Sequence, residues 1–240
     1  RLVAAREDMD ASVELFGSLD WPQFERETEY ISLTKDDEYA FVGGRIKTTD
    51  GFEYPVEDYL KVTNEKCVPT STAKWTHHNR DAYMVGALAR FNNNYDQLQP
   101  KAKEAAEHLG MKPLVTNTYL NSAAQVVEMV HCVEDAIDII NELLERGIEP
   151  EEPAEITRTS GEGVASCDVP RGILFHHYKY EDGICQEANC IIPTNQNYAN
   201  LDLDMKALAP QIIDQPEDDI RLAMEMLVRA YDPCISCSTH

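Results

Sequence analysis

The carboxyl-terminal stretch decides how the rest of the chain is interpreted, and it reads Arg229-Ala230-Tyr231-Asp232-Pro233-Cys234-Ile235-Ser236-Cys237-Ser238-Thr239-His240. It gathers two cysteines, Cys234 and Cys237, and a histidine, His240, at spacings that suit metal ligation. In a Cys-x-x-Cys pair both thiolates can turn toward one ion, and soft thiolates favour zinc, copper(I), nickel or iron over hard cations. The preceding chain is therefore interpreted as a scaffold for this tail.

Four chemistries compete for the tail. A redox dithiol opens a helix after a strand, but here the helical pattern precedes the cysteines. A c-type haem attachment needs histidine directly after the second cysteine, whereas His240 follows Cys237 by three positions. A structural zinc site needs four ligands, and the tail supplies three at most, so another segment must contribute. A frayed terminus with idle thiols is the remaining alternative.

The tail resembles the carboxyl-terminal motif of the large, nickel-binding subunit of nickel–iron hydrogenases, in the soluble multisubunit cytoplasmic branch. In that family the precursor is cut after this histidine once nickel is loaded, so the end at His240 is expected to match the mature form. The first residue, Arg1, is not methionine, and we expect a fragment or a processed chain.

The resemblance implies a function for the tail. Cys234 is expected to be the terminal nickel ligand and Cys237 a ligand that bridges nickel to iron, with cyanide and carbon monoxide on the iron. The implied reaction is the reversible heterolytic cleavage of H2, with Cys234 receiving the proton. Thiolates suit this work because they bind soft metals and can bridge two ions.

A second stretch with chemical content runs from Gly161 to Tyr178 and contains Pro170-Arg171-Gly172. It resembles the hydrogenase segment whose arginine hangs over the bimetallic centre, and by that match Arg171 is this arginine. Arginine is a permanent cation with a rigid donor fork. The family usually has glutamate where Asp168 stands. The shorter aspartate side chain is expected to alter how the arginine is held. The alternative is a surface salt bridge.

Residues 193–198 resemble the family's Pro-(Ser/Thr)-x-x-Asn segment. The resemblance implies that Pro193 lines the pocket and that Thr194 donates a hydrogen bond to an iron-bound cyanide. It also implies that the carbonyl of Tyr198 binds a magnesium or iron ion together with His240.

Composition limits the partners. The formal net charge of −22 argues against nucleic acid or an anionic membrane, since both attract basic patches. No run approaches the roughly 18 apolar residues of a membrane span, and no leader opens the chain. The seven cysteines are not spaced as a dense disulfide framework, which indicates reduced thiols, and the cytoplasm is therefore the expected location.

The expected fold is α+β and mainly α, with long core helices, a small antiparallel meander and a hairpin. Short β-prone runs at 29–33, 38–42, 45–48 and 52–54 are separated by glycine turns. Helices are expected at 100–110, at 122–146 and before the tail. We expect one hydrogenase large-subunit domain over 1–240, with the meander at 21–60, a helical core at 100–147 and active-site segments at 161–240.

The long helix is expected to bury the apolar positions that recur at spacings of three and four, which are Val126, Val130, Val133, Ile137, Ile140 and Leu144. Three further expectations concern residues outside the motifs. Cys132 is expected to be a small buried hydrophobe. Cys185 and Cys190 are expected on opposite faces of one strand, and His77 and His78 as a polar surface pair.

One part of the family pattern has no counterpart here. The resemblance requires a second Cys-x-x-Cys pair near the amino terminus, and none is found; Cys67 is no substitute. We therefore predict that a separate polypeptide or a missing segment supplies these thiolates, and that the chain alone neither binds nickel stably nor oxidises hydrogen. An iron–sulfur small subunit is implied as a partner, together with further electron-transfer subunits. The alternatives are a zinc-stabilised interaction module and a non-catalytic hydrogenase-like subunit.

Overall fold

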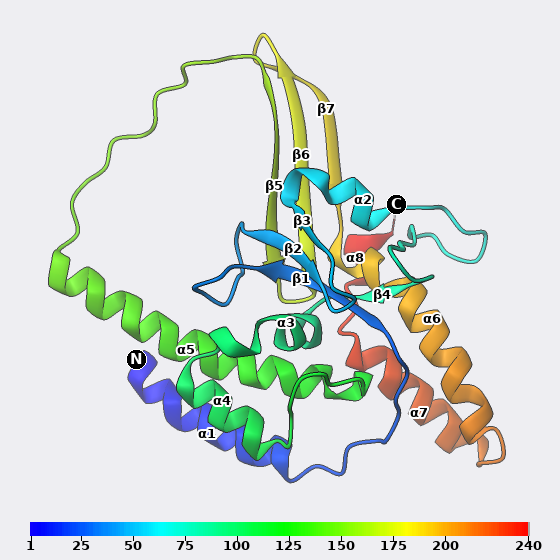
Figure 1. Ribbon diagram of the computed structural model, residues 1–240. Coiled ribbons are helices and arrows are strands. Elements are labelled where there is room, and N and C mark those ends of the chain that lie inside the picture. The colour runs from blue at the N-terminus through cyan, green and yellow to red at the C-terminus, as the bar shows by residue number, and fades with distance from the viewer. Residues whose placement is uncertain (240) are drawn as a thin grey trace.

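The computed structural model describes residues 1–239, with the longer helices grouped in one part of the molecule and most strands, with the short helices among them, in the other (Figure 1). The helices are α1 (Leu2–Gly17), α2 (Tyr59–Thr63), α3 (Ala87–Asn94), α4 (Pro100–His108), α5 (Asn121–Arg146), α6 (Pro193–Ile212), α7 (Glu217–Ala230) and α8 (Ile235–Ser238). The strands are β1 (Glu29–Thr34), β2 (Arg45–Thr48), β3 (Glu53–Pro55), β4 (Tyr83–Met84), β5 (Gly161–Val169), β6 (Gly172–Glu181) and β7 (Ile184–Ile191). Single 3₁₀ turns cover Val56–Asp58, Tyr95–Gln97 and Thr118–Leu120.

The strands form two sheets. In the four-stranded sheet the order is β3-β2-β1-β4, with β1 antiparallel to β2 but parallel to β4. The predicted antiparallel meander is therefore confirmed for β1, β2 and β3, and the structure adds β4, from outside that stretch, parallel to β1. The run 38–42 is not a strand: Tyr39 and Ala40 point into the core, and only Val42 makes an isolated bridge, to Cys167.

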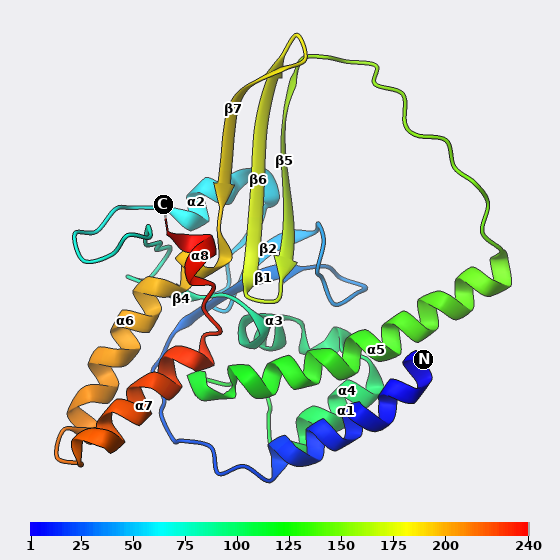
Figure 2. The same cartoon turned by 180° about the vertical axis from the view of Figure 1, so that it is seen from behind.

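The second sheet is antiparallel, in the order β5-β6-β7, and extends away from the helices in both views (Figures 1 and 2). Its base is buried: Ile173, Phe175 and Ile191 pack with Ile31 and Tyr83 of the first sheet. Its outer half is largely exposed. The sheet thus anchors at one end, the end that carries the Pro170–Gly172 turn.

A register shift at Lys179/Tyr180 changes which side chains share a face of this sheet. His176 pairs with Cys190 and Tyr180 pairs with Cys185. Because side chains alternate along β6, His176 and Tyr180 lie on the same face, and so do their partners. The expectation that Cys185 and Cys190 lie on opposite faces is therefore wrong, because the irregularity adds one residue to β7 between them.

The long helix is confirmed at 121–146, but only half of its apolar stripe is core. Val126 and Val130 are buried against α1, α3 and α4. Ile140 is 45% exposed and Leu144 is 73% exposed. The prediction that the whole stripe is core is wrong, because α5 extends beyond the helices that cover its first half (Figures 1 and 2).

Two further helices were not predicted from the sequence. α1 is a full helix that packs on α5, where Arg6 pairs with Glu134. α6 starts with Pro193 at its first position, where a proline costs no hydrogen bond. Its buried face is polar, with Thr194, Asn197 and Asp204 all under 5% exposed.

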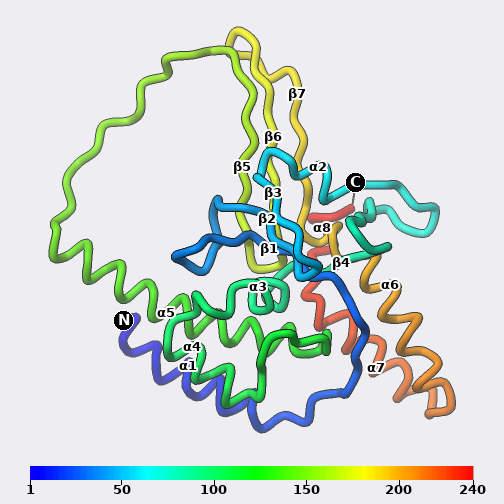
Figure 3. Tube along the Cα trace, viewed as in Figure 1, coloured from blue at the N-terminus to red at the C-terminus, as the bar shows by residue number. Residues whose placement is uncertain are grey.

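A long linker over residues 147–160 connects α5 to β5. Figure 3 shows this segment as an arc that leaves the end of α5 and returns at the far end of the second sheet. Its last residues meet the β6–β7 turn, where the N–H of Gly183 donates to the Thr159 carbonyl at 2.8 Å. Every residue of 147–160 is nevertheless exposed. The side chains of the linker therefore pack little against the rest of the described chain.

Candidate metal centre

A buried polar network fixes the point at which the tail leaves α7. Tyr231, directly after the helix, donates its hydroxyl proton to Asp204 at 2.6 Å and accepts from the amide of Asn200 at 2.7 Å. Thr118 also donates to Asp204, at 2.8 Å, and Arg26 pairs with the same carboxylate. Burial, and the nearby Asp204 charge, raise the pKa of Tyr231 well above its usual value, so the phenol stays protonated. The tail therefore starts from a rigid base.

The next residue, Asp232, meets Arg171. The arginine donates from Nε to the Asp232 carbonyl at 2.6 Å and from Nη2 to its carboxylate at 3.1 Å. Gln125 of α5 donates to the other carboxylate oxygen at 3.2 Å. Asp232 has φ of 48°, a left-handed conformation that aspartate tolerates better than most residues. The contact joins the Pro170–Gly172 turn to the start of the Cys-x-x-Cys segment.

Cys234 and Cys237 lie together at the end of this path. Their Cα atoms are 5.4 Å apart and their sulfurs are joined in a disulfide. The backbone N–H of Cys234 donates to the Thr194 hydroxyl at 3.2 Å, and α8 carries Cys237. Cys234 is half-buried and Cys237 is exposed. Two soft donors therefore sit side by side, with Cys237 open to the outside of the molecule.

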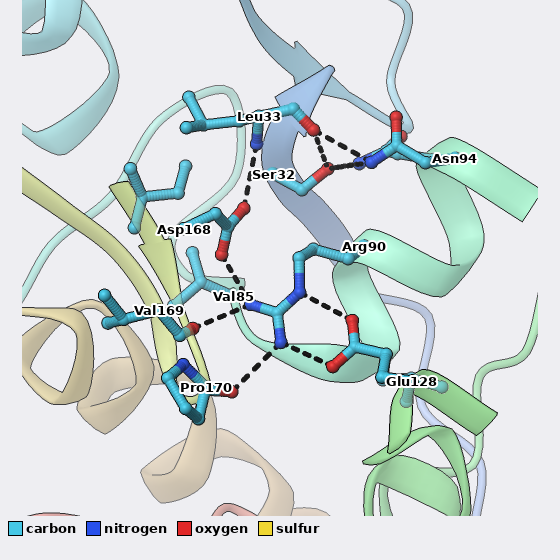
Figure 4. Close-up of polar contacts among 12 residues, drawn as sticks. Ser32, Leu33, Val85, Arg90, Asn94, Glu128, Asp168, Val169 and Pro170 are labelled. Atoms are coloured by element: carbon cyan, nitrogen blue, oxygen red, sulfur yellow. Dashed lines mark hydrogen bonds and ion pairs between the residues drawn. The ribbon is translucent and has the colours of Figure 1, made fainter. Parts of the chain in front are cut away.

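A buried ionic cluster supports the turn that holds Arg171 (Figure 4). Arg90, fully buried, donates to both carboxylate oxygens of Glu128 at 2.6 and 2.7 Å and to Asp168 at 2.6 Å. It also donates to the carbonyls of Val169 at 2.8 Å and Pro170 at 3.1 Å. Arg90 thus binds the two peptide groups that precede Arg171.

The charges of this cluster shift one another's pKa values. Burial on its own lowers the pKa of Arg90, but the carboxylates of Glu128 and Asp168 raise it well above the usual value. Burial raises the pKa of Asp168 to about 6, although Arg90 and the Leu33 N–H both stabilise its charged form. At neutral pH the cluster therefore consists of one cation and two carboxylates.

Two glycines allow the turn to approach the chain beneath it. A Cβ on Gly172, whose φ is 133°, would lie 2.2 Å from a methyl carbon of Val85. A Cβ on Gly86, whose φ is 109°, would lie 3.3 Å from the carbonyl oxygen of Arg171. Segments 85–86 and 170–172 are therefore in contact through their backbones.

The structure brings most of the sequence-predicted residues to one region. Cys234, Cys237, Arg171 and Thr194 are connected through the contacts above, and Pro193 precedes Thr194 at the start of α6. Tyr198 lies on the same helix, and its hydroxyl is 3.0 Å from that of Ser238. His240, the predicted magnesium or iron ligand, lies outside the described residues.

The donor set fits a soft metal in part. Two sulfurs meet, and reduction of their bond makes both available as thiolates. The Thr194 hydroxyl oxygen accepts a hydrogen bond from the Cys234 N–H, so the hydroxyl proton remains available for a second partner. Thr194 is 3% exposed. Within residues 1–239 there is no group of three or more histidine, cysteine, aspartate or glutamate side chains arranged for a metal ion.

The contacts of two histidines and one aspartate add detail to the region, and one of these residues corrects an expectation. The His78 ring is only 7% exposed and lies between Glu29 at 2.7 Å and the Tyr54 hydroxyl at 3.0 Å, so it is not a surface residue. His176 is 2.8 Å from the Tyr178 hydroxyl, beside Cys190. Asp168 contacts Arg90 and not Arg171, so it holds the predicted arginine indirectly, through the turn.

Asp232, Gln125 and Arg90 were not singled out as site residues from the sequence. Asp232 had a local signal, because an Asp-Pro pair before a ligand pair favours a turn. Gln125 and Arg90 had none, since their partners are distant in sequence.

Known proteins share much of the sequence of this chain. The model of a family described as nickel-dependent hydrogenase matches residues 49–240, most of the chain. The chain belongs to the nickel-dependent hydrogenase family. The alpha chain of sulfhydrogenase 1 from Pyrococcus furiosus is 38% identical to this hydrogenase chain over 232 residues, covering 95% of the chain and 53% of that protein. An F420-non-reducing hydrogenase subunit of Methanothermobacter thermautotrophicus is 32% identical over 235 residues, covering 89% of the chain and 48% of that protein.

A solved structure agrees with the family assignment. A NAD+-reducing nickel–iron hydrogenase in the H2-reduced state superposes over 100% of the hydrogenase chain and 58% of its own chain, with a TM-score of 0.82 and 25% identity. The prediction from the sequence that this chain belongs to a hydrogenase large subunit is confirmed. The chain spans about half the length of the curated relatives it matches. In the described part of the chain no helix is both long and apolar enough to cross a membrane.

Proposed function

We propose that this chain is part of the catalytic subunit of a nickel–iron hydrogenase that cleaves H2 heterolytically and reversibly. The observation that carries the proposal is the pair of adjacent sulfurs at Cys234 and Cys237, placed on a rigid base beside Arg171 and Thr194. A nickel–iron group with cyanide and carbon monoxide on iron fits this donor set and, when bound, supplies the cleavage of H2.

The residues have distinct roles in this proposal. In the reduced chain, Cys234 and Cys237 bind as thiolates, and Sγ of Cys234 holds the proton released from H2. Arg171, kept in place by Asp232, presents its remaining N–H groups beside the pair. The buried Thr194 hydroxyl accepts from Cys234 and donates to an anionic group at the centre, while Pro193 excludes water.

Other parts of the enzyme complete the centre. The remaining thiolates come from a segment or polypeptide outside these residues, because Cys234 and Cys237 provide only two. The carbonyl of Tyr198 and His240 hold a magnesium or iron ion. Electrons leave through iron–sulfur clusters of a small-subunit partner, and further subunits carry them to the final acceptor.

The test uses the native complex purified anaerobically through a tag on this chain. We expect about one nickel per chain, infrared bands in the metal carbonyl and cyanide region, and hydrogen-dependent dye reduction. Cys234→Ser abolishes all three, whereas Cys185→Ser, at an exposed cysteine in the outer half of the second sheet, leaves them unchanged. Zinc alone without carbonyl bands refutes the proposal and favours the zinc-stabilised module. Nickel binding and dye reduction by the isolated chain refute the need for outside thiolates.

A further inference from the structure

An apolar stripe lies uncovered on the second half of α5. Its members recur at spacings of three and four and therefore share one helix face; they are Met129, Cys132, Val133, Ala136, Ile140, Leu143 and Leu144. Met129 and Ile140 are each 45% exposed and Leu144 is 73% exposed. The opposite face is occupied, because Glu134 there pairs with Arg6 of α1. We call these seven residues the α5 stripe.

The α5 stripe begins inside a cavity of about 490 Å³ next to the candidate metal centre. Phe41, Met129, Cys132 and Pro170 form apolar parts of its lining. Cys132 was expected to be a small buried hydrophobe, but it is exposed, and the partial burial of its thiol beside the cavity raises its pKa to about 11. The cavity and the stripe form one continuous apolar surface.

This surface leads directly to the site. Gln125 also lines the cavity, and its amide donates to Asp232, the residue that holds Arg171. A segment seated in the cavity therefore lies one side chain away from the Arg171–Asp232 contact. Any occupant of the stripe is in a position to bring groups to the centre.

The carboxyl-terminal end of α5 and the linker that follows it are strongly acidic. Between residues 142 and 155 there are six acidic residues, Glu142, Glu145, Glu149, Glu151, Glu152 and Glu155, and one basic residue, Arg146. The linker that carries most of them bows away from α5 and contributes no cover, with Ile148 at 79% and Ile156 at 85% exposure (Figures 2 and 3). An occupant with basic flanks is favoured, and a second copy of this chain, with the same charges, is repelled.

We propose that the α5 stripe and its cavity are the docking surface for an amphipathic helix with lysine or arginine flanks, carried by the segment that supplies the remaining thiolates. This inference rests on the proposed function. The stripe runs from Met129 to Leu144, about 22 Å at about 1.5 Å per residue, which matches a helix of about four turns. The relatives are about twice as long as the chain they match, so in those proteins a comparable length of polypeptide is available to cover this face.

A zero-length cross-linking experiment tests the occupant. Carbodiimide joins carboxylates to lysines in contact, and it is applied to the native complex purified through a tag on this chain. We expect Glu149, Glu151 or Glu152, just beyond the carboxyl-terminal end of the stripe, to be joined to a lysine in a helical segment of the polypeptide that carries the second Cys-x-x-Cys pair. Joining to a second copy of this chain, to a polypeptide without that pair, or to nothing while other carboxylates react overturns the proposal.

Thiol labelling tests the surface itself. Ile140→Cys places a thiol in the stripe, and Ile213→Cys, at a residue 64% exposed between α6 and α7, is the matched control. We expect maleimide to label position 140 at least tenfold more slowly in the native complex than in the isolated chain, and position 213 equally in both. Equal labelling of position 140 in both overturns the proposal.

The two proposals fail separately. Nickel and carbonyl bands in a complex whose position 140 stays open to maleimide leave the proposed function intact and refute the docking surface. Protection of position 140 by the Cys-x-x-Cys polypeptide, in a complex without nickel or carbonyl bands, supports the docking surface and refutes the proposed function.

Discussion

Replacing Arg90 by methionine removes the cation of the buried cluster while keeping an unbranched side chain. Five hydrogen bonds are lost, and the carboxylates of Glu128 and Asp168 remain without their counter-ion at sites that are 10% and 0% exposed. Breaking a buried ion pair from one side typically costs about 3–5 kcal/mol. For a protein with a total stability of about 5–15 kcal/mol this is a large fraction.

Urea unfolding followed by far-UV circular dichroism measures the loss. With a slope of about 2–3 kcal/mol per molar urea, Arg90→Met is expected to lower the midpoint by about 1–2 M. Arg90→Lys keeps the charge but not the fork and is expected to lose less than Arg90→Met. Adding Glu128→Gln and Asp168→Asn to Arg90→Met removes the uncompensated charges and should recover at least about 1 kcal/mol. A loss below about 1 kcal/mol for Arg90→Met, or no recovery in the triple variant, refutes the electrostatic reasoning.

Three further predictions concern neighbouring residues. Burial raises the pKa of Asp168 from 3.8 to about 6, so the folded state binds this proton more tightly than the unfolded chain does. The free energy of unfolding of the wild type, relative to that of Asp168→Asn, should therefore fall as pH rises from about 4 through 6. Urea titrations at several pH values measure this difference, and a difference that does not change with pH would contradict the prediction. Arg171→Lys should increase deuterium uptake in the tail peptide 232–239 at least severalfold while changing global stability by under about 1 kcal/mol, because this arginine is 40% exposed; unchanged uptake contradicts the clamp. Tyr231→Phe should lower stability by about 1–3 kcal/mol, seen as a lower thermal midpoint, because Asp204 and Asn200 each lose a buried partner, and an unaltered midpoint argues against that network.

Local patterns in the sequence predicted the elements whose cause is local. The periodicity of apolar residues indicated α5 to within one residue, and the Gly43-Gly44 and Asp50-Gly51 pairs marked turns of the first sheet. Periodicity identifies the apolar face of a helix but not the neighbour that covers it, so it could not show that Ile140 and Leu144 are exposed.

The polar face of α6 shows why other parts could not be predicted. Its amides look like surface residues, yet Asn197 bonds both the N–H and the carbonyl of Val85 at 2.8 and 3.3 Å, and Gln196 bonds the carbonyl of Ile173 at 2.5 Å. Each hydrogen-bond partner lies on a segment distant in sequence, so the residues around positions 196 and 197 do not identify it. The same holds for Arg90, whereas Cys234, Cys237, Arg171 and Thr194 were singled out because they belong to motifs.

The close approach of Gly172 to the Val85 side chain separates two kinds of constraint at neighbouring positions. A saturation library sorted only for protease resistance should return glycine at position 172, because any side chain there collides whatever the protein is asked to do. The same library should accept many residues at position 171, where the side chain is 40% exposed, unless it is sorted in the complete complex for the cleavage of H2 proposed above. Comparing the two sorted libraries would separate, within the Pro-Arg-Gly motif, the glycine that packing requires from the arginine that the proposed reaction requires.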